Sequence, residues 1–208
     1  MKDEQGYIRD IAEIRSMMER SSKFLSLSGL AGVMAGIYAL VGAYIAYQFF
    51  SFNPDNIAYS NRAAGSLHPN LLEVVVLGLL ILVLAIGTAV YLSHKKAVKR
   101  RESIWNPTAR RMLLSMAIPL VAGGLLILVM IAKGLLGLIA PLTLLFYGLA
   151  LYNASQFTYV EVKNMGLIQI GLGLLSAYFV GYALLFWALG FGVVHIVYGI
   201  YMHYRYER

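Results

Sequence analysis

The sequence contains no cysteine. Thiolate catalysis, cysteine-bound zinc, iron–sulfur clusters and disulfide bonds are therefore excluded, because each requires a cysteine sulfur. Aspartate is almost as scarce, since Asp3, Asp10 and Asp55 are the only three and none falls in a long apolar run. The sequence also lacks an HExxH, a GxSxG and a phosphate-binding GxxxxGK[ST] motif. It thus predicts no metal site, no cofactor and no catalytic residue of a familiar motif.

Charge is scarce as well, and long apolar runs take its place. Charged residues make up 13% of the 208 residues and hydrophobic residues 60%, whereas a soluble domain has about 25% charged residues. Apolar runs of about 18 or more residues are typical of transmembrane helices, because the hydrocarbon core is about 30 Å thick. Backbone polar groups must be satisfied within lipid, so these spans should be helical. The sequence predicts an all-α polytopic membrane helix bundle.

Six transmembrane helices are predicted. They cover residues 24–50, 71–93, 112–132, 134–152, 159–180 and 184–204. The last apolar block is too long for one span, so a turn is expected near Val180–Ala183. Asn106 followed by Pro107 is typical of an N-cap and first helical residue. Thr158 and Glu161 have capping-box spacing, which predicts a helix start near Tyr159.

The distribution of lysine and arginine predicts the orientation. Fifteen of the 17 lie on one side of this topology, twelve of them in residues 1–23 and in the basic loop 94–111. The other side has Arg62 and Lys133. The positive-inside rule therefore predicts that both termini are cytoplasmic. No nucleic-acid partner is expected, because cytoplasmic loops of membrane proteins commonly collect such charge.

Residues 1–23 are predicted to form an N-terminal cytoplasmic amphipathic helix. Tyr7, Ile11, Ile14 and Met18 recur at helical spacing and form a narrow apolar seam. Five basic and five acidic residues balance in this segment, so it is not a polybasic lipid anchor. Two interpretations remain open. The helix either lies along the inner membrane interface or the bundle, or it binds a cytoplasmic protein partner through residues 3–23.

Small residues form a ridge along the first predicted span. Gly29, Gly32 and Gly36 recur at helical spacing, and the last two form a GxxxG motif. Such residues allow membrane helices to approach closely. Packing within the chain is the favoured interpretation, and a homo-oligomer is the alternative.

His195 is the candidate functional residue. It lies eleven residues into the sixth span, about 16 Å deep and near the midplane. Gly192 and Gly199 share its helical face, so the ring should point into the bundle. A charged imidazole is costly in hydrocarbon, which predicts a neutral, hydrogen-bonded ring. The expected partner is a hydroxyl on the fourth or fifth span, with Ser176 as the first choice. The candidate pocket residues are His195, Ser176, Thr143, Tyr147, Tyr198 and Trp187, and His195 is either a packing residue or a ligand contact.

Two prolines fall inside predicted spans. Pro119 and Pro141 each free the carbonyl of the residue four positions earlier, at Ser115 and Gly137. Freed carbonyls can mark a transport site in broken membrane helices. The alternative is that each proline only bends its helix.

Three stretches resemble a group of small six-helix bacterial inner-membrane proteins that has no assigned activity. They are RSMMERSSKFLSLSGLAGVMAG (15–36), YGLALYNASQFTY (147–159) and FWALGFGVVHIVYG (186–199). The resemblance implies a bacterial inner-membrane setting and supplies no catalytic residue.

Three functions are consistent with these patterns. The first is a non-enzymatic bundle that senses a membrane lipid or small hydrophobic molecule, or scaffolds a partner. The second is a small transporter or channel that uses the proline-containing spans. The third is a membrane enzyme centred on His195.

Overall fold

The computed structural model describes residues 28–50, 70–99 and 105–207. Their main helices are α2 (Gly29–Gln48), α4 (Leu71–Lys99), α5 (Pro107–Ala132), α6 (Ile139–Ala154), α7 (Val160–Tyr178), α8 (Ala183–Trp187) and α9 (His195–Tyr206). Short 3-10 turns occur at η1 (Leu136–Leu138), η2 (Ser155–Phe157) and η3 (Val180–Tyr182), and η4 (Ala188–Val194) is a π-helix. The described part of the chain is all-helical, as the sequence predicted. The predicted helix at 3–23 lies outside it.

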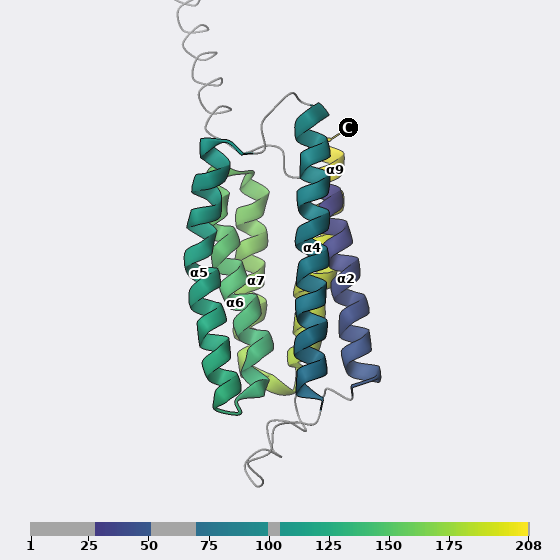
Figure 1. The fold of residues 1–208 in the computed structure, drawn as a ribbon, viewed down its shortest axis with the longest axis vertical. Helices are drawn as coiled ribbons and strands as arrows, with labels where there is room; N and C mark the ends of the chain where they lie inside the picture. Colours follow the sequence, from purple (N-terminus) through teal and green to yellow (C-terminus); the bar gives the residue numbers. More distant parts are fainter. Residues whose placement is uncertain (1–27, 51–69, 100–104, 208) are drawn as a thin grey trace, which may run out of the picture.

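Five helical segments are long and apolar enough to cross a membrane. They are Gly29–Gln48, Leu71–Lys99, Pro107–Ala132, Leu136–Phe157 and Val180–Tyr206. Helix α7 lies alongside them (Figure 1) but carries polar residues, including Glu161, Lys163 and Gln169, and does not reach that apolarity. The architecture is compatible with a multi-pass membrane protein. The 3-10 turn η3 falls where the long C-terminal apolar block was predicted to turn.

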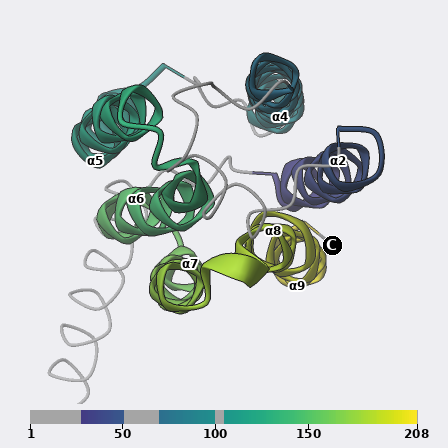
Figure 2. The ribbon, with the colours of Figure 1, turned by 90° about the horizontal axis from the view of Figure 1, so that it is seen from below.

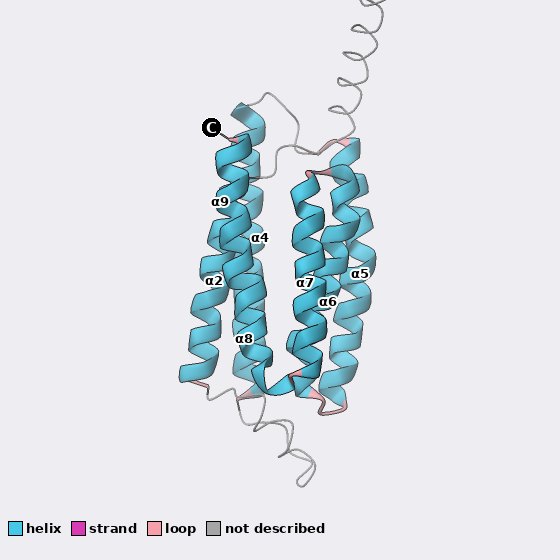
Figure 3. Ribbon diagram, turned by 180° about the vertical axis from the view of Figure 1, so that it is seen from behind, coloured by secondary structure: helices cyan, strands magenta, loops and turns pink. Residues whose placement is uncertain are grey.

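The helices form two groups of three. Helices α5, α6 and α7 lie together in one group, and α2, α4 and the α8–η4–α9 segment form the other (Figures 1 and 2). Within the second group, α2 packs between α4 and α9, and α8 joins the groups through contacts with α6 and α7. The view from behind shows α7 and α8 meeting at the end opposite the C-terminus (Figure 3). The groups are therefore closest at that end.

Two predicted helix starts and one boundary can be compared with the structure. The Asn106 side chain accepts a 2.7 Å hydrogen bond from the Ala109 amide, which confirms the predicted N-cap. Helix α7 begins at Val160 with Tyr159 as its N-cap, which confirms the predicted start near Tyr159. The capping box itself is wrong, since Tyr159 has no side-chain cap and the Thr158 hydroxyl donates to Ala154 O over 3.3 Å. Helix α4 continues to Lys99, so residues 94–99, which were predicted in the basic loop, are helical.

Both prolines lie in helices that continue past them. Pro119 lies inside α5, and the Ser115 carbonyl that it frees accepts a 3.3 Å hydrogen bond from Asn153 Nδ2 of α6. Pro141 lies in the first turn of α6, where a proline interrupts no helical hydrogen bond. Pro141 thus interrupts no helical hydrogen bond, and the carbonyl that Pro119 frees at Ser115 is already bound by Asn153.

The glycine ridge of α2 packs within the chain against η4 and α9. A Cβ atom built on Gly29 would lie 2.5 Å from Gly199 O, and one on Gly36 would lie 2.6 Å from Gly192 O. Gly32 is slightly less crowded, with a Cβ 3.3 Å from His195 O. This close approach brings the polypeptide on both sides of His195 against α2. The close packing is the small-residue packing expected of membrane helices.

Candidate functional site

His195 lies at the junction of η4 and α9 and points into the bundle. The residue is only 6% exposed. Its Nδ1 is 2.9 Å from Gly190 O, and its Nε2 is 2.9 Å from the Tyr147 hydroxyl of α6. A carbonyl oxygen can only accept, so Nδ1 carries the hydrogen; in the neutral ring Nε2 then accepts from Tyr147. One neutral tautomer therefore satisfies both nitrogens.

Gln169 of α7 belongs to the same network. Its side chain is fully buried, and its Nε2 donates to Gly190 O over 2.8 Å. Nε2 also lies 3.5 Å from His195 Nδ1, but both atoms carry hydrogens in this tautomer, so the contact is not a hydrogen bond. Rotating the amide would direct its oxygen at Gly190 O, which has no hydrogen to give. Gly190 O thus accepts from two side chains, one for each lone pair.

Gly190 lies inside the π-helix η4, and its lack of a side chain shapes the network. A Cβ at this position would collide with Gln169 Oε1 and with a Leu144 methyl group. Single-turn π-helices are rare and often occur at functional sites. Gly190 therefore provides both the acceptor and the space that let α6 and α7 approach the sixth predicted span.

An aromatic layer covers the network on one side. The Phe191 ring lies 5.1 Å from the Tyr147 ring and 5.7 Å from the His195 ring, measured between centroids. Trp187 packs on the far side of Phe191, also at 5.1 Å. Trp187 therefore reaches His195 only through Phe191 and does not wall a pocket beside it.

The remaining predicted site residues are not brought to His195. The prediction of a hydroxyl partner on the fourth or fifth span is confirmed by Tyr147. The first choice, Ser176, is wrong, because its buried Oγ has no hydrogen-bond partner among the described residues. Thr143 donates to Ala140 O of its own helix over 2.7 Å. Gln169 was missed, although an amide in the middle of an apolar run was a visible signal. Within the described ranges, no cluster of three or more His, Asp or Glu residues could hold a metal ion.

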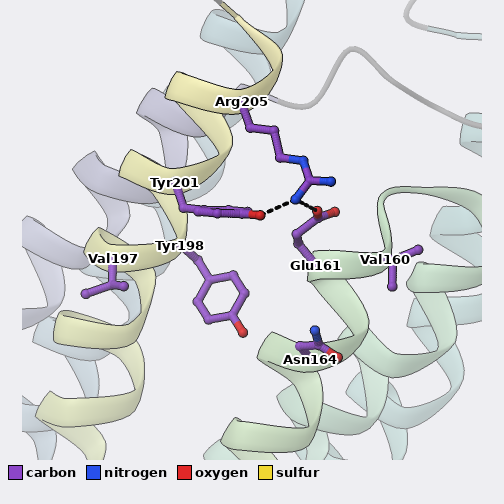
Figure 4. Close-up of a pocket in the computed structure, with 7 residues that line it drawn as sticks. All are labelled: Val160, Glu161, Asn164, Val197, Tyr198, Tyr201 and Arg205. Atoms are coloured by element: carbon purple, nitrogen blue, oxygen red, sulfur yellow. Dashed lines mark hydrogen bonds and ion pairs between the residues drawn. The ribbon is translucent and has the colours of Figure 1, made fainter.

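Tyr198 lies instead at a second region, a cavity between α7 and α9. The cavity has a volume of about 390 Å³ and is lined by Val160, Glu161, Asn164, Val197, Tyr198, Tyr201 and Arg205. Its wall is partly apolar. Figure 4 shows the Tyr198 ring extending from α9 toward α7, where Asn164 lies. Neither the Tyr198 hydroxyl nor the Asn164 amide is hydrogen-bonded to another lining residue drawn in Figure 4.

An ion pair forms the rim of this cavity. Arg205 Nη1 lies 3.3 Å from Glu161 Oε1 and also donates to the Tyr201 hydroxyl (Figure 4). Glu161 Oε1 accepts a second hydrogen bond, of 2.9 Å, from the Tyr206 hydroxyl. Both Arg205 contacts use the same nitrogen. The guanidinium carbon also lies 5.6 Å from the centroid of the Tyr201 ring and 5.5 Å from that of the Tyr206 ring. The rim therefore holds α7 to the end of α9 through Nη1 and these ring contacts.

Glu207 joins three helices just beyond the end of α9. Its Oε1 accepts from the Gly29 amide over 2.8 Å and from Lys96 Nζ over 3.0 Å, and its Oε2 lies 2.6 Å from His203 Nδ1. Burial raises the pKa of the Glu207 carboxyl, but the hydrogen bonds from His203, Gly29 and Lys96 outweigh it, so the net pKa is lowered. We call this group the Glu207 clamp.

Comparisons of the chain with family models, with curated proteins and with solved structures found no match. The buried network, the cavity and the Glu207 clamp are the features of the described residues that bear on function.

Proposed function

We propose that the protein is a six-span protein of the bacterial inner membrane with both termini in the cytoplasm. In this proposal it is a non-enzymatic sensor that binds a lipid or another small amphipathic molecule between α7 and α9. The observation that carries the proposal is the cavity of about 390 Å³, which combines an apolar wall at Val197 with a charged rim at Arg205 and Glu161. Ligand pockets typically pair apolar walls with a few polar groups that fix orientation.

The cavity lies at the basic end of the bundle. Seven described basic residues are found at this end: Lys95, Lys96, Lys99, Arg110, Arg111, Lys163 and Arg205. In the described ranges, the opposite end has Lys133. The positive-inside rule supports a cytoplasmic position for the first group. The cavity would then lie at the inner membrane interface, with Val197 toward the hydrocarbon and Arg205 toward water.

The cavity is also next to the Glu207 clamp. Arg205 and Glu207 are two residues apart at the end of α9, and Glu207 holds the first residue of α2 through the Gly29 amide. A ligand that binds one conformation of the Arg205 side chain better than another shifts the populations of the two conformations. We propose that this shift passes through Glu207 to α2 and to residues 3–23. That segment would present the signal to a cytoplasmic protein partner.

A cavity-filling substitution tests ligand binding. Val197→Trp places an indole in the cavity, whereas Ile200→Trp adds the same group at another exposed position of α9. We expect the wild-type protein and Ile200→Trp to retain a co-purifying lipid, detected by native mass spectrometry, and Val197→Trp to lose it. Equal retention by all three folded proteins would overturn the proposed ligand site.

An enzyme centred on His195 is the second candidate, because the Tyr147 hydroxyl lies within hydrogen-bond reach. A general base must contact the proton that it removes. Here Nε2 is engaged by Tyr147 and Nδ1 by Gly190 O, so a substrate would have to displace one of them. The geometry supports a role for His195 in joining helices better than a role in chemistry.

A further inference from the structure

We infer that the ligand of this cavity is a phospholipid, held through the phosphate of its head group by Arg205, Tyr198 and Asn164. The inference rests on the proposed function and names the ligand class for the same cavity. Inorganic phosphate offers the same chemistry without an acyl chain, so the test below separates the two.

The side chains that line the cavity offer several hydrogen-bond donors. The Tyr198 hydroxyl and the Asn164 amide line the cavity, and neither is hydrogen-bonded to another of the lining residues drawn in Figure 4. Arg205 uses only Nη1 for Glu161 and Tyr201, and a guanidinium has five N–H donors. Three side chains thus offer hydrogen-bond donors to one ligand. The guanidinium matches the geometry of a phosphate group, and hydrogen bonds between two charged groups are stronger than those between neutral groups. A phosphate oxygen is therefore a favourable acceptor for Arg205.

The Glu161 carboxylate does not prevent an anion from binding. Its charge is paired with Arg205, and its Oε1 also accepts from Tyr206. Its Oε2 is buried and has no hydrogen-bond partner among the described residues. Val160, which lines the cavity, is the first residue of α7. The positive end of that helix dipole favours a negative charge nearby. Arg205 and the start of α7 therefore offset the Glu161 charge beside a single phosphodiester group.

The apolar wall is the second argument, and it distinguishes a lipid from free phosphate. Val197 is 56% exposed and lies along α9 toward the membrane interior from Arg205. The Tyr198 ring packs against the apolar cluster of Val162, Met165 and Met202. The cavity of about 390 Å³ is at the small end of ligand pockets. It would hold a head group and the first carbons, while the acyl chains continue along Val197 into the bilayer.

Binding of defined lipids to the delipidated full-length protein tests the inference. The probes are phosphatidylglycerol, phosphatidylethanolamine and diacylglycerol, which lacks the phosphate, and binding is measured by native mass spectrometry. We expect diacylglycerol to bind at least about tenfold more weakly than either phospholipid, because it loses the charged hydrogen bonds to Arg205. Inorganic phosphate should not displace the phospholipid. Displacement by phosphate alone would overturn the lipid assignment.

Two substitutions connect the affinity to named donors. Tyr198→Phe removes one oxygen atom and should weaken phospholipid binding about threefold to tenfold, and Arg205→Gln should weaken it tenfold or more. Tyr178→Phe, at the exposed far end of α7, is the matched control and should leave it unchanged. Neither substitution in the cavity should change diacylglycerol binding. If Arg205→Gln does not fold, Tyr198→Phe still decides the question.

The outcomes separate this inference from the proposed function. If diacylglycerol binds as tightly as phospholipid and Val197→Trp abolishes both, the cavity binds lipid but not through phosphate, and the inference is wrong. If Val197→Trp binds every lipid as the wild-type protein does, the proposed ligand site itself is wrong. Unchanged phospholipid affinity in both Tyr198→Phe and Arg205→Gln would also overturn the inference.

Discussion

The Tyr147 hydroxyl donates to His195 Nε2 over 2.9 Å, although 48 positions separate the two residues in the sequence. The bond joins α6 to the start of α9, and Gly190 O extends it to Gln169 of α7. Three segments are therefore tied by one buried polar network. Because each nitrogen of His195 has its partner within the chain, the network fixes the rotation of α9 about its axis.

Breaking the hydrogen bond between Tyr147 and His195 should lower the free energy of unfolding only slightly, and the effects of the two substitutions should not be additive. We expect Tyr147→Phe and His195→Leu each to lower the free energy of unfolding by about 1 kcal/mol, since each leaves one buried polar group unpaired. The double variant should lose less free energy of unfolding than the sum of the two single losses. In the double variant, neither substitution leaves the other residue's polar group buried and unpaired. Reversible unfolding in mixed detergent micelles measures all three. Strictly additive losses would show that the two side chains do not interact.

The glycine in the π-helix provides a second prediction. Gly190→Ala places a Cβ against Gln169 Oε1 and Leu144, so we expect a loss of about 1–3 kcal/mol from overpacking. Gly171→Ala is the matched control in α7, because a Cβ there meets nothing within 4 Å. That change should be neutral or stabilise the helix by up to about 1 kcal/mol. The two variants are compared by unfolding under identical conditions, and equal effects would refute the packing argument.

Local sequence patterns predicted the helices and the direction of the His195 ring, but not which hydroxyl contacts it. Apolar runs predicted the helices, and the shared face of Gly192, His195 and Gly199 predicted an inward ring. A hydroxyl partner on the fourth or fifth span was predicted correctly, but Ser176 was chosen over Tyr147 because the depth of Ser176 was misjudged. Ser176 lies seven residues beyond Gln169 in α7, about 10 Å farther along the helix axis. Helical spacing predicts on which face of a helix a residue lies. Which residues of two antiparallel helices lie at the same depth depends on where each helix starts.

The Glu207 clamp could not be predicted in this way. Glu207 and Gly29 are 178 positions apart, and no periodic pattern relates the two ends of a chain. The clamp requires α2 and α9 to pack closely, which the glycines allow. The cavity likewise depends on how α7 and α9 diverge, so it follows from the three-dimensional packing and not from either helix alone.

The clamp predicts a pH dependence of stability. A carboxyl whose pKa is lowered in the folded state contributes stability above its unfolded pKa and loses it as the pH falls through the folded pKa. The pKa of Glu207 is lowered from 4.5. As the pH falls from 7 to well below 4.5, we therefore expect the melting temperature of the wild-type protein to fall more than that of Glu207→Gln. Glu73→Gln, at the exposed start of α4, should behave as the wild type. Parallel curves for all three proteins would contradict the clamp.

The orientation can be tested with single cysteines, because the chain has none of its own. Gln48 lies at the end of α2 opposite the Glu207 clamp, and Gln156 lies in η2 at the clamp end; both are exposed. If both termini are cytoplasmic, a membrane-impermeant thiol reagent added to intact cells should label Gln48→Cys and not Gln156→Cys. Both variants should react after the cells are lysed, which shows that each thiol is accessible. Labelling of Gln156→Cys alone would invert the orientation, and the cavity between α7 and α9 would then face the outer leaflet.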